Sequence, residues 1–302
     1  MRTDDLVTEL AVAQRRLRRR ALLIAGVGAL LVAAAAGALW RSQRPAPYPP
    51  PIERPYLWRV DGAHPSYLLG TVHVEYGFDD LPASVHAAFA GATTVVVESD
   101  LLQPARPAPP PASPDAPPDA PGGRDRLTAD EWARLARLTE VPEAALVGVT
   151  SSKLLGGVLA AQTRRIEPMD RGIQARATAA RKAVVFLEDR DLTAITTADD
   201  QAVISEATVL AQLRQAIAQP QALRAGLRRI VRAYADGGPQ GCASVSGAGL
   251  VDQLNDDWLA AIVAAVDRGD AFVAIGCAHL VGADGVVARL AARGYAVTRI
   301  AR

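Results

Sequence analysis

The 302-residue sequence contains only two cysteines and four histidines. Two cysteines are too few for a disulfide-rich scaffold or for a four-cysteine metal site. The formal net charge is only +1, so nothing in the overall charge attracts nucleic acid and we expect no nucleic-acid partner. Half of the residues are hydrophobic, and a chain of this length can bury a sizeable core in one large or two small domains.

A long uncharged run covers residues 21–40 and follows a cluster of five arginines. Twenty residues of α-helix span about 30 Å, the thickness of the hydrocarbon core of a bilayer. Because arginines stay on the cytoplasmic side, we predict a cytoplasmic segment over 1–20, one transmembrane helix over 21–40, and a main domain outside the cytoplasm, in the periplasm or at the cell surface. The small residues at 33–38 leave a cleaved signal peptide as the alternative.

Two proline-rich stretches divide the rest of the chain. Residues 41–55 are predicted to form a stiff, extended stalk between the membrane helix and a domain over 56–302. The second stretch, at about 103–126, has no apolar periodicity and cannot bury enough surface to order itself, so we predict a disordered insertion within that domain.

An apolar run followed by Gly-x-x-His occurs twice, ending in Gly70 and His73 and again in Gly276 and His279. A third apolar run, of consecutive valines, ends in Glu98. In an α/β sheet, functional side chains stand just past the carboxyl ends of the strands, so these three runs predict a site at one sheet edge. We expect the first glycine to be needed for its backbone freedom in a sharp turn after the strand.

The remaining periodicity predicts a mixed, largely parallel α/β sheet with flanking helices. The chain from 271 to 300 reads as strand, helix, strand, which is the order of a parallel crossover. A Thr-x-x-Glu capping box at Thr128 predicts the start of a helix. The predicted strands cover 56–60, 67–69, 94–98, 183–187, 271–275 and 295–300, the first two as a hairpin, and the predicted late helices cover 251–267 and 284–293.

The two motif histidines and Glu98 permit two kinds of chemistry. Two imidazoles and a carboxylate can hold a divalent metal ion that activates water, with His73, Glu98 and His279 as ligands. Without a metal, one histidine oriented by a carboxylate can take a proton from water directly. The residue pattern leaves both open. His64 and His86 are expected to be ordinary surface or packing histidines.

These residues resemble the TraB/GumN family, which is related to the Tiki membrane metalloproteases and more distantly to the ChaN and erythromycin-esterase fold. The resemblance rests on Leu69-Gly-Thr-Val-His73, on Val97-Glu98 and on the segment from Ala274 to Gly282, and covers 56–301 except for the insertion. It implies an α/β core with a helical insert and an active site containing both Gly-x-x-His motifs and the glutamate.

The resemblance extends to Asp170 and Glu188, as acidic positions with less defined roles. Asp170 is either a partner that orients a histidine or a helix cap, and Glu188 faces either the same sheet edge or solvent. Leu254 stands where many relatives have arginine, and Cys277 stands where a small residue is usual. We expect Cys277 to be a buried small residue rather than a metal ligand or nucleophile, with a disulfide to Cys242 as the alternative.

From these features we predict a membrane-anchored, extracytoplasmic, metal-dependent hydrolase that acts on a peptide or another small molecule, most simply a peptidase. Manganese, cobalt and zinc suit the ligand set equally. The first alternative is a binding protein that sequesters a peptide, haem or other small ligand in the same pocket without turnover. A scaffold with a remnant site is a third hypothesis.

Overall fold

The computed structural model describes residues 48–103, 123–163, 166–188, 206–242 and 248–300. The predicted cytoplasmic segment, transmembrane helix and first half of the stalk lie outside these residues, as does most of the proline-rich insertion. In these five ranges no helix is both long and apolar enough to cross a bilayer. The chain divides into two units, Met1–Tyr48 and Pro49–Arg302, and the second contains all the elements described below.

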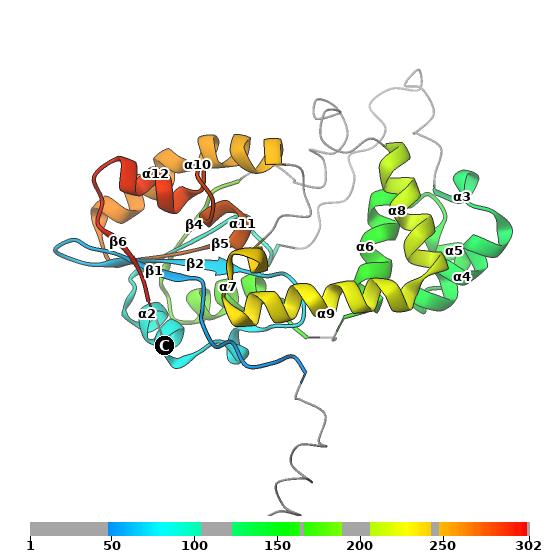
Figure 1. Ribbon diagram of the computed structural model, residues 1–302, viewed down its shortest axis with the longest axis horizontal. Helices are drawn as coiled ribbons and strands as arrows, with labels where there is room; N and C mark the ends of the chain where they lie inside the picture. Colours follow the sequence, from blue (N-terminus) through cyan, green and yellow to red (C-terminus); the bar gives the residue numbers. More distant parts are fainter. Residues whose placement is uncertain (1–47, 104–122, 164–165, 189–205, 243–247, 301–302) are drawn as a thin grey trace, which may run out of the picture. The chain divides into compact units, whose positions relative to one another are not determined.

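A six-stranded sheet forms the core of the second unit, with strand order β4-β3-β5-β2-β1-β6 (Figure 1). The pairs β4/β3, β3/β5 and β5/β2 are parallel, whereas β1 is antiparallel to both β2 and β6. The predicted mixed, largely parallel sheet is therefore confirmed. The strands are β1 (Leu57–Val60), β2 (Ser66–Thr71), β3 (Thr94–Val97), β4 (Ala183–Phe186), β5 (Ala271–Gly276) and β6 (Val297–Arg299).

The amino-acid composition of the central strands explains why these segments form buried β-structure. All six residues of β5 are buried, and they form a continuous apolar run without polar alternation. Such a run suits a strand covered on both faces, and the three successive valines of β3 are β-branched residues that fit a pleated surface. The predicted hairpin is present as β1 and β2, which pair Leu57 with Leu69 and Val60 with Ser66.

The two C-terminal strands, β5 and β6, are parallel but are not neighbours in the sheet. β5 and β6 run in the same direction, with α12 (Val286–Ala292) between them in the sequence, as predicted for a parallel crossover. They are not neighbours, however, because β2 and β1 lie between them in the sheet. β1 pairs with β2 along one edge, and β6 pairs with the other edge of β1 rather than with β5.

Helices cover both faces of the sheet (Figure 1). α10 (Ala248–Arg268) and α12 lie on one face, and α2 (Ala83–Gly91) and α7 (Met169–Ala179) lie on the other. Both α10 and α7 contact β3 and β5, the two strands that lead to candidate site residues. The short helix α11 (Cys277–Leu280) follows β5 directly.

The predicted helical insert has an apolar cluster of its own. Thr128 begins α4 with the predicted capping box: its hydroxyl accepts the Glu131 N–H at 3.2 Å, and the Glu131 carboxylate accepts the Thr128 N–H at 2.8 Å. Trp132, Leu135, Leu154 and Leu213 are among the buried members of the cluster. The helices are α3 (Gly123–Arg126), α4 (Ala129–Thr139), α5 (Glu143–Leu146), α6 (Ser151–Ala161) and α8 (Glu206–Ala218).

A long helix, α9 (Pro220–Asp236), runs from the end of α8 toward the sheet and is followed by the short 3-10 helix η2 (Pro239–Cys242). α9 begins with a proline, which is tolerated there because an N–H in the first helical turn would have no partner within the helix. It ends at Gly237, which has a φ of 66° in the left-handed region. A second 3-10 helix, η1 (Phe78–Asp80), precedes α2.

Candidate active site

The ends of three neighbouring strands bring the candidate site together. In β2 and β5, Thr71 is paired with Gly276, and in β3 and β5, Val97 is paired with Ala274. The three parallel strands therefore end at nearly the same level, and the residues just past their ends share one edge of the sheet. His73 and Glu98 follow β2 and β3, and His279 lies on α11 after β5.

Gly276 lies at the point where these three side chains meet. From the position that a Cβ atom would take at Gly276, Glu98 Oε1 is 3.1 Å away, and His73 Nε2 and His279 Cδ2 are each 3.6 Å away. The absence of a side chain at Gly276 therefore provides the space between the two imidazoles and the carboxylate. The structure brings together the three residues that the motifs predicted to be neighbours.

His73 is held by a buried carboxylate on α7. Its Nδ1 lies 2.7 Å from Asp170 Oδ2, and the other oxygen of Asp170 accepts a hydrogen bond from the Thr71 hydroxyl at 2.5 Å. Asp170 is only 7% exposed, so its charge is poorly screened by solvent. Of the two roles predicted for Asp170, the histidine partner is the one seen, and the bond leaves His73 Nε2 facing the space beside Gly276.

His279 has an uncharged partner on α10. Its Nδ1 lies 2.9 Å from Asn255 Oδ1, and the amide nitrogen of Asn255 donates to the carbonyl of Asp284 at 3.3 Å. Because the amide oxygen accepts, His279 carries its proton on Nδ1 and keeps a lone pair on Nε2. Trp258, one turn further along α10, packs its ring 4.7 Å from the His279 ring.

The two motif histidines differ in pKa because a carboxylate partner dominates at His73 and burial dominates at His279. The hydrogen bond and negative charge of Asp170 raise the pKa of His73 to about 9, against the opposing effect of burial. Burial lowers the pKa of His279 to about 4, and the nearby positive charge of His73 adds to this effect. Near neutral pH and without a metal, His73 is therefore an imidazolium and His279 a neutral base.

Glu98 is a half-buried carboxylate in the wall of a pocket. Its Oε1 accepts the Gly276 N–H at 2.5 Å, so one oxygen remains for another partner. Burial raises the pKa of Glu98, and the neighbouring Asp170 charge raises it further, while His73 acts in the opposite direction. A positive charge placed beside the free oxygen would stabilise the ionised form.

A pocket of about 240 Å³ opens beside these groups. Neither His279 nor Glu188 lies in its wall. Glu188 follows β4, is 4% exposed, and donates its backbone N–H to the Glu98 carbonyl at 2.7 Å, so it neighbours the site through the main chain. The pocket is lined by His73, Val97, Glu98, Ser99, Leu101 and Asp170.

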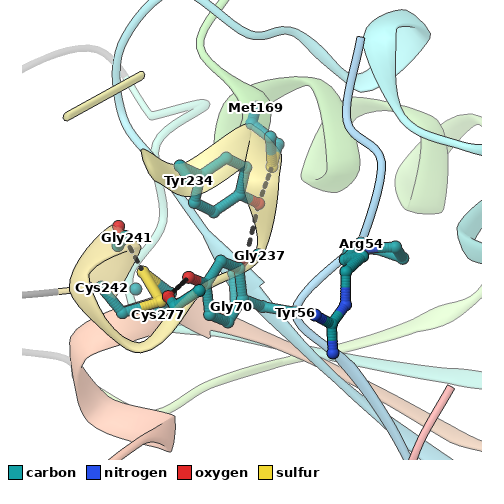
Figure 2. The surroundings of a disulfide bond; sticks show 12 residues. Arg54, Tyr56, Gly70, Met169, Tyr234, Gly237, Gly241, Cys242 and Cys277 are labelled. Atoms are coloured by element: carbon teal, nitrogen blue, oxygen red, sulfur yellow. Dashed lines mark hydrogen bonds between the residues drawn. A yellow bond between two sulfur atoms is a disulfide. The ribbon is translucent and has the colours of Figure 1, made fainter. Parts of the chain in front are cut away.

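The two motif glycines have different reasons to be glycine. Gly70 does not adopt a positive φ, so the expectation that it provides backbone freedom is wrong. A Cβ atom at Gly70 would instead lie 2.6 Å from Cys277 Cβ and 3.0 Å from Tyr56 Cβ, so close packing excludes a side chain. The Gly70 carbonyl also accepts the Tyr234 hydroxyl at 2.7 Å (Figure 2).

Cys277 forms a disulfide with Cys242, which connects the motif helix α11 to η2 (Figure 2). The expectation that Cys277 is an unpaired small residue is wrong, and the alternative is correct. Both cysteines are buried, at 7% and 4% exposure. The two cysteines are 35 residues apart in the sequence, and they meet only because the end of α9 returns to the sheet. The sequence alone therefore did not decide whether they pair.

Comparison with known families places the whole arrangement in context. The family model of the TraB/PrgY/gumN family matches residues 56–299. The chain belongs to this family. The TraB/GumN resemblance is thereby confirmed. The matched range includes both Gly-x-x-His motifs, Glu98 and the helical insert. No curated protein and no solved structure matches the chain.

The TraB family assignment leaves the cofactor open. Among the residues that the structure describes, there is no group of three or more His, Cys, Asp or Glu side chains arranged to hold a metal ion. The contact that sequence reasoning missed is Asn255 on His279. The resemblance concerns position 254, next to Asn255. The spacing of Asn255 and Trp258 places both side chains on one face of a helix. Only the fold shows that this face contacts His279.

Proposed function

We propose that this TraB family protein is a membrane-anchored, extracytoplasmic hydrolase, most simply a peptidase, in which His73, Glu98 and His279 activate a water molecule. The observation that carries the proposal is the meeting of these three side chains around Gly276, each with an atom within 3.6 Å of one point. In the reaction, water adds across an amide bond and yields a carboxylate and an amine. The groups required are a proton acceptor for the water and positive charge near the developing oxyanion.

The donor chemistry of the three residues fits a divalent metal ion. Both histidines have Nδ1 occupied by an oxygen acceptor, which is the usual support for an imidazole that binds metal through Nε2. Glu98 would add a carboxylate oxygen whose ionised form needs a nearby cation. A bound manganese, cobalt or zinc ion would supply a water that loses its proton near neutral pH.

The protein's own groups have defined parts in this proposal. Asp170 orients the His73 ring, and Asn255 selects the tautomer of His279 whose Nε2 lone pair accepts a proton. Without a metal, the charged His73 and neutral His279 form an acid and a base side by side, the arrangement expected when two environments push pKa values apart. Both forms use the same residues and predict the same losses on substitution.

The disulfide supports the extracytoplasmic location. Disulfides persist in oxidising compartments and are rare in the cytosol. The cystine joins the second Gly-x-x-His motif to the segment after α9 and is buried, so it belongs to the core of the domain. Together with the arginine-flanked apolar run at 21–40, it supports an inner-membrane or plasma-membrane protein with one helix and its main domain outside.

The second candidate function is a binding protein that sequesters a peptide, haem or other small ligand in the same pocket. One feature favours it: Leu254 stands where the family resemblance leads us to expect an arginine. Leu254 is 9% exposed, so an apolar side chain packs there and no cation is available from this position. A site without that charge binds a carbonyl oxygen less strongly in the transition state.

The decisive experiment compares His73→Ala with His64→Ala in the purified full-length protein. The two histidines are matched: each has its Nδ1 near an aspartate, at 2.7 Å and 3.2 Å, and their side chains are 62% and 68% exposed. Metal content and cleavage of a random peptide library are measured with added manganese, cobalt or zinc. We expect cleavage by the wild type and by His64→Ala, and a loss of at least about 100-fold in His73→Ala.

Equal metal response and equal cleavage in the two variants would refute the hydrolase proposal. Peptide binding without any cleavage by the wild type would instead support the sequestering protein. Turnover that disappears in His279→Ala would exclude that second function.

A further inference from the structure

Leu101 is a large apolar side chain that is 40% exposed and lines the pocket beside Glu98 and His73. An exposed leucine alone needs no explanation. This one lies three residues after Glu98, on the segment that leaves β3 at the active edge of the sheet. Its surroundings show that its position is fixed by the fold.

Two side chains of α7 hold the backbone of Leu101 on both sides. Its N–H donates to Gln174 Oε1 at 2.9 Å, and its carbonyl accepts from Arg171 Nη1 at 2.5 Å. Gln174 is 2% exposed, so one of these bonds is protected from water. The same helix carries Asp170, which orients His73, so α7 positions both the His73 ring and Leu101.

A further set of bonds closes the turn before Leu101. Asp100 Oδ1 accepts from Gln174 Nε2 at 2.5 Å and from the Leu102 N–H at 3.0 Å. The Gln174 side chain thus uses both ends of its amide on consecutive residues, Asp100 and Leu101. These contacts fix the backbone at Leu101, where its side chain lines the pocket.

The size and lining of the pocket indicate what it can take. Its volume of about 240 Å³ is below the roughly 300 to 1,000 Å³ of sites that enclose whole drug-sized ligands. It therefore suits one side chain of a longer substrate. Leu101 and the 3% exposed Val97 supply the apolar part of the wall, and the reacting groups supply the polar part.

We propose that Leu101 and Val97 form a specificity wall that selects substrates with an apolar side chain next to the hydrolysed bond. This inference rests on the proposed hydrolase function and names its substrate class. An apolar side chain placed against the wall leaves its neighbouring carbonyl near His73 and Glu98. A charged side chain in the same place would lose its hydration without gaining a partner from the wall.

The test profiles cleavage of a randomised decapeptide mixture by the full-length protein in detergent, with products identified by mass spectrometry. The variants are Leu101→Ala and Leu101→Glu, and Ile230→Ala is the control, because Ile230 is 36% exposed on α9 and lines no part of the pocket. We expect Leu101→Ala to reduce the preference for apolar over polar side chains about ten-fold, and Leu101→Glu to shift it toward basic side chains. Ile230→Ala should retain the wild-type preference.

A second measurement does not need turnover. A decapeptide mixture containing photo-reactive leucine is cross-linked to the wild type and to Leu101→Glu, and the labelled residues are mapped. We expect labelling at residues 97–101 that falls at least several-fold in Leu101→Glu. Unchanged cleavage preference in both Leu101 variants, or labelling no stronger at 97–101 than at Ile230, overturns the inference. Absence of cleavage by the wild type refutes the hydrolase function alone, and the cross-linking result then decides whether the wall binds apolar side chains.

Discussion

Replacement of Gly276 by alanine separates the chemistry of the site from the stability of the fold. The backbone at Gly276 has a φ of −49° and a ψ of 132°, which alanine adopts without strain. The new methyl group would occupy the space shared by Glu98, His73 and His279, at 3.1 to 3.6 Å from one atom of each. A side chain there excludes either a metal ion or a catalytic water.

The two effects of this substitution have different sizes. Because the nearest contact of the methyl group is the end of the Glu98 side chain, we expect a stability loss of about 1 kcal/mol or less, at the low end for overpacking. For a domain of this size, that lowers Tm by roughly 2 to 4 °C. General acid–base catalysis contributes about 100-fold or more to a rate, and we expect at least a 100-fold loss in peptide cleavage when the methyl group takes the place of the reacting water.

Gly70→Ala is the matched control, because it makes the same chemical change in the first motif. Its methyl group would lie 2.6 Å from Cys277 Cβ and 2.9 Å from Cys277 Cα, in packing that cannot open toward a pocket. We expect a stability loss of about 1 to 3 kcal/mol or more for this variant. Thermal unfolding by circular dichroism and cleavage of the peptide library are measured on both variants. Wild-type cleavage by Gly276→Ala, or a loss of Tm as large as that of Gly70→Ala, would refute the view that Gly276 keeps the site open.

Three further predictions follow from the partners of the site. The folded pKa of His73, about 9, exceeds its ordinary value of 6.5, so its contribution to stability is full below about pH 6.5 and is lost as the pH rises through about 9. We expect Asp170→Asn to flatten this decline in metal-free thermal melts, with a small amplitude because the His73 side chain is 62% exposed; equal slopes of Tm against pH in the two proteins would contradict it. Asn255→Asp should raise the pKa of His279 from about 4, measured by NMR titration of its ring, and an unchanged value would show that the amide does not control this histidine. Replacing both cysteines by alanine releases a loop of 35 residues, which corresponds to about 4 kcal/mol and a fall in Tm of roughly 10 °C; a Tm within 2 °C of the wild type would show that the cystine does not stabilise the domain.

The sequence was sufficient to predict which residues share the sheet edge. Strands that end in Gly-x-x-His or in Glu are readable from local apolar runs, and parallel neighbours must end on the same side. In the sheet, the strand of the second motif, β5, lies between β3, which leads to Glu98, and β2, which leads to the first motif. The fold class and the hairpin could be predicted for the same reason, since both depend on short-range patterns.

The sequence offered the Cys242–Cys277 disulfide only as an alternative and did not show which side chains pack against Gly70. The disulfide depends on α9 returning its C-terminal end to the sheet, where the backbone N–H of Glu53 also bonds to the carbonyl of Ala235 at 2.9 Å. Gly70 is a glycine because of side chains more than 200 residues away, at Cys277, and no local pattern carries that information. Both errors about these residues came from explaining them by their neighbours in sequence.

The same limit explains why the two Gly-x-x-His motifs looked equivalent. Each histidine follows a buried strand, and each has its Nδ1 bound by an oxygen, so the sequence pattern and the hydrogen-bond geometry agree. The difference lies in their surroundings: the carboxylate of Asp170 raises the pKa of His73, whereas burial and the charge of His73 lower the pKa of His279, whose partner Asn255 is uncharged. Because the partners come from different helices, α7 and α10, each can change without altering either motif. A relative that exchanged amide for carboxylate at these two positions would keep both motifs and reverse which histidine serves as the acid and which as the base.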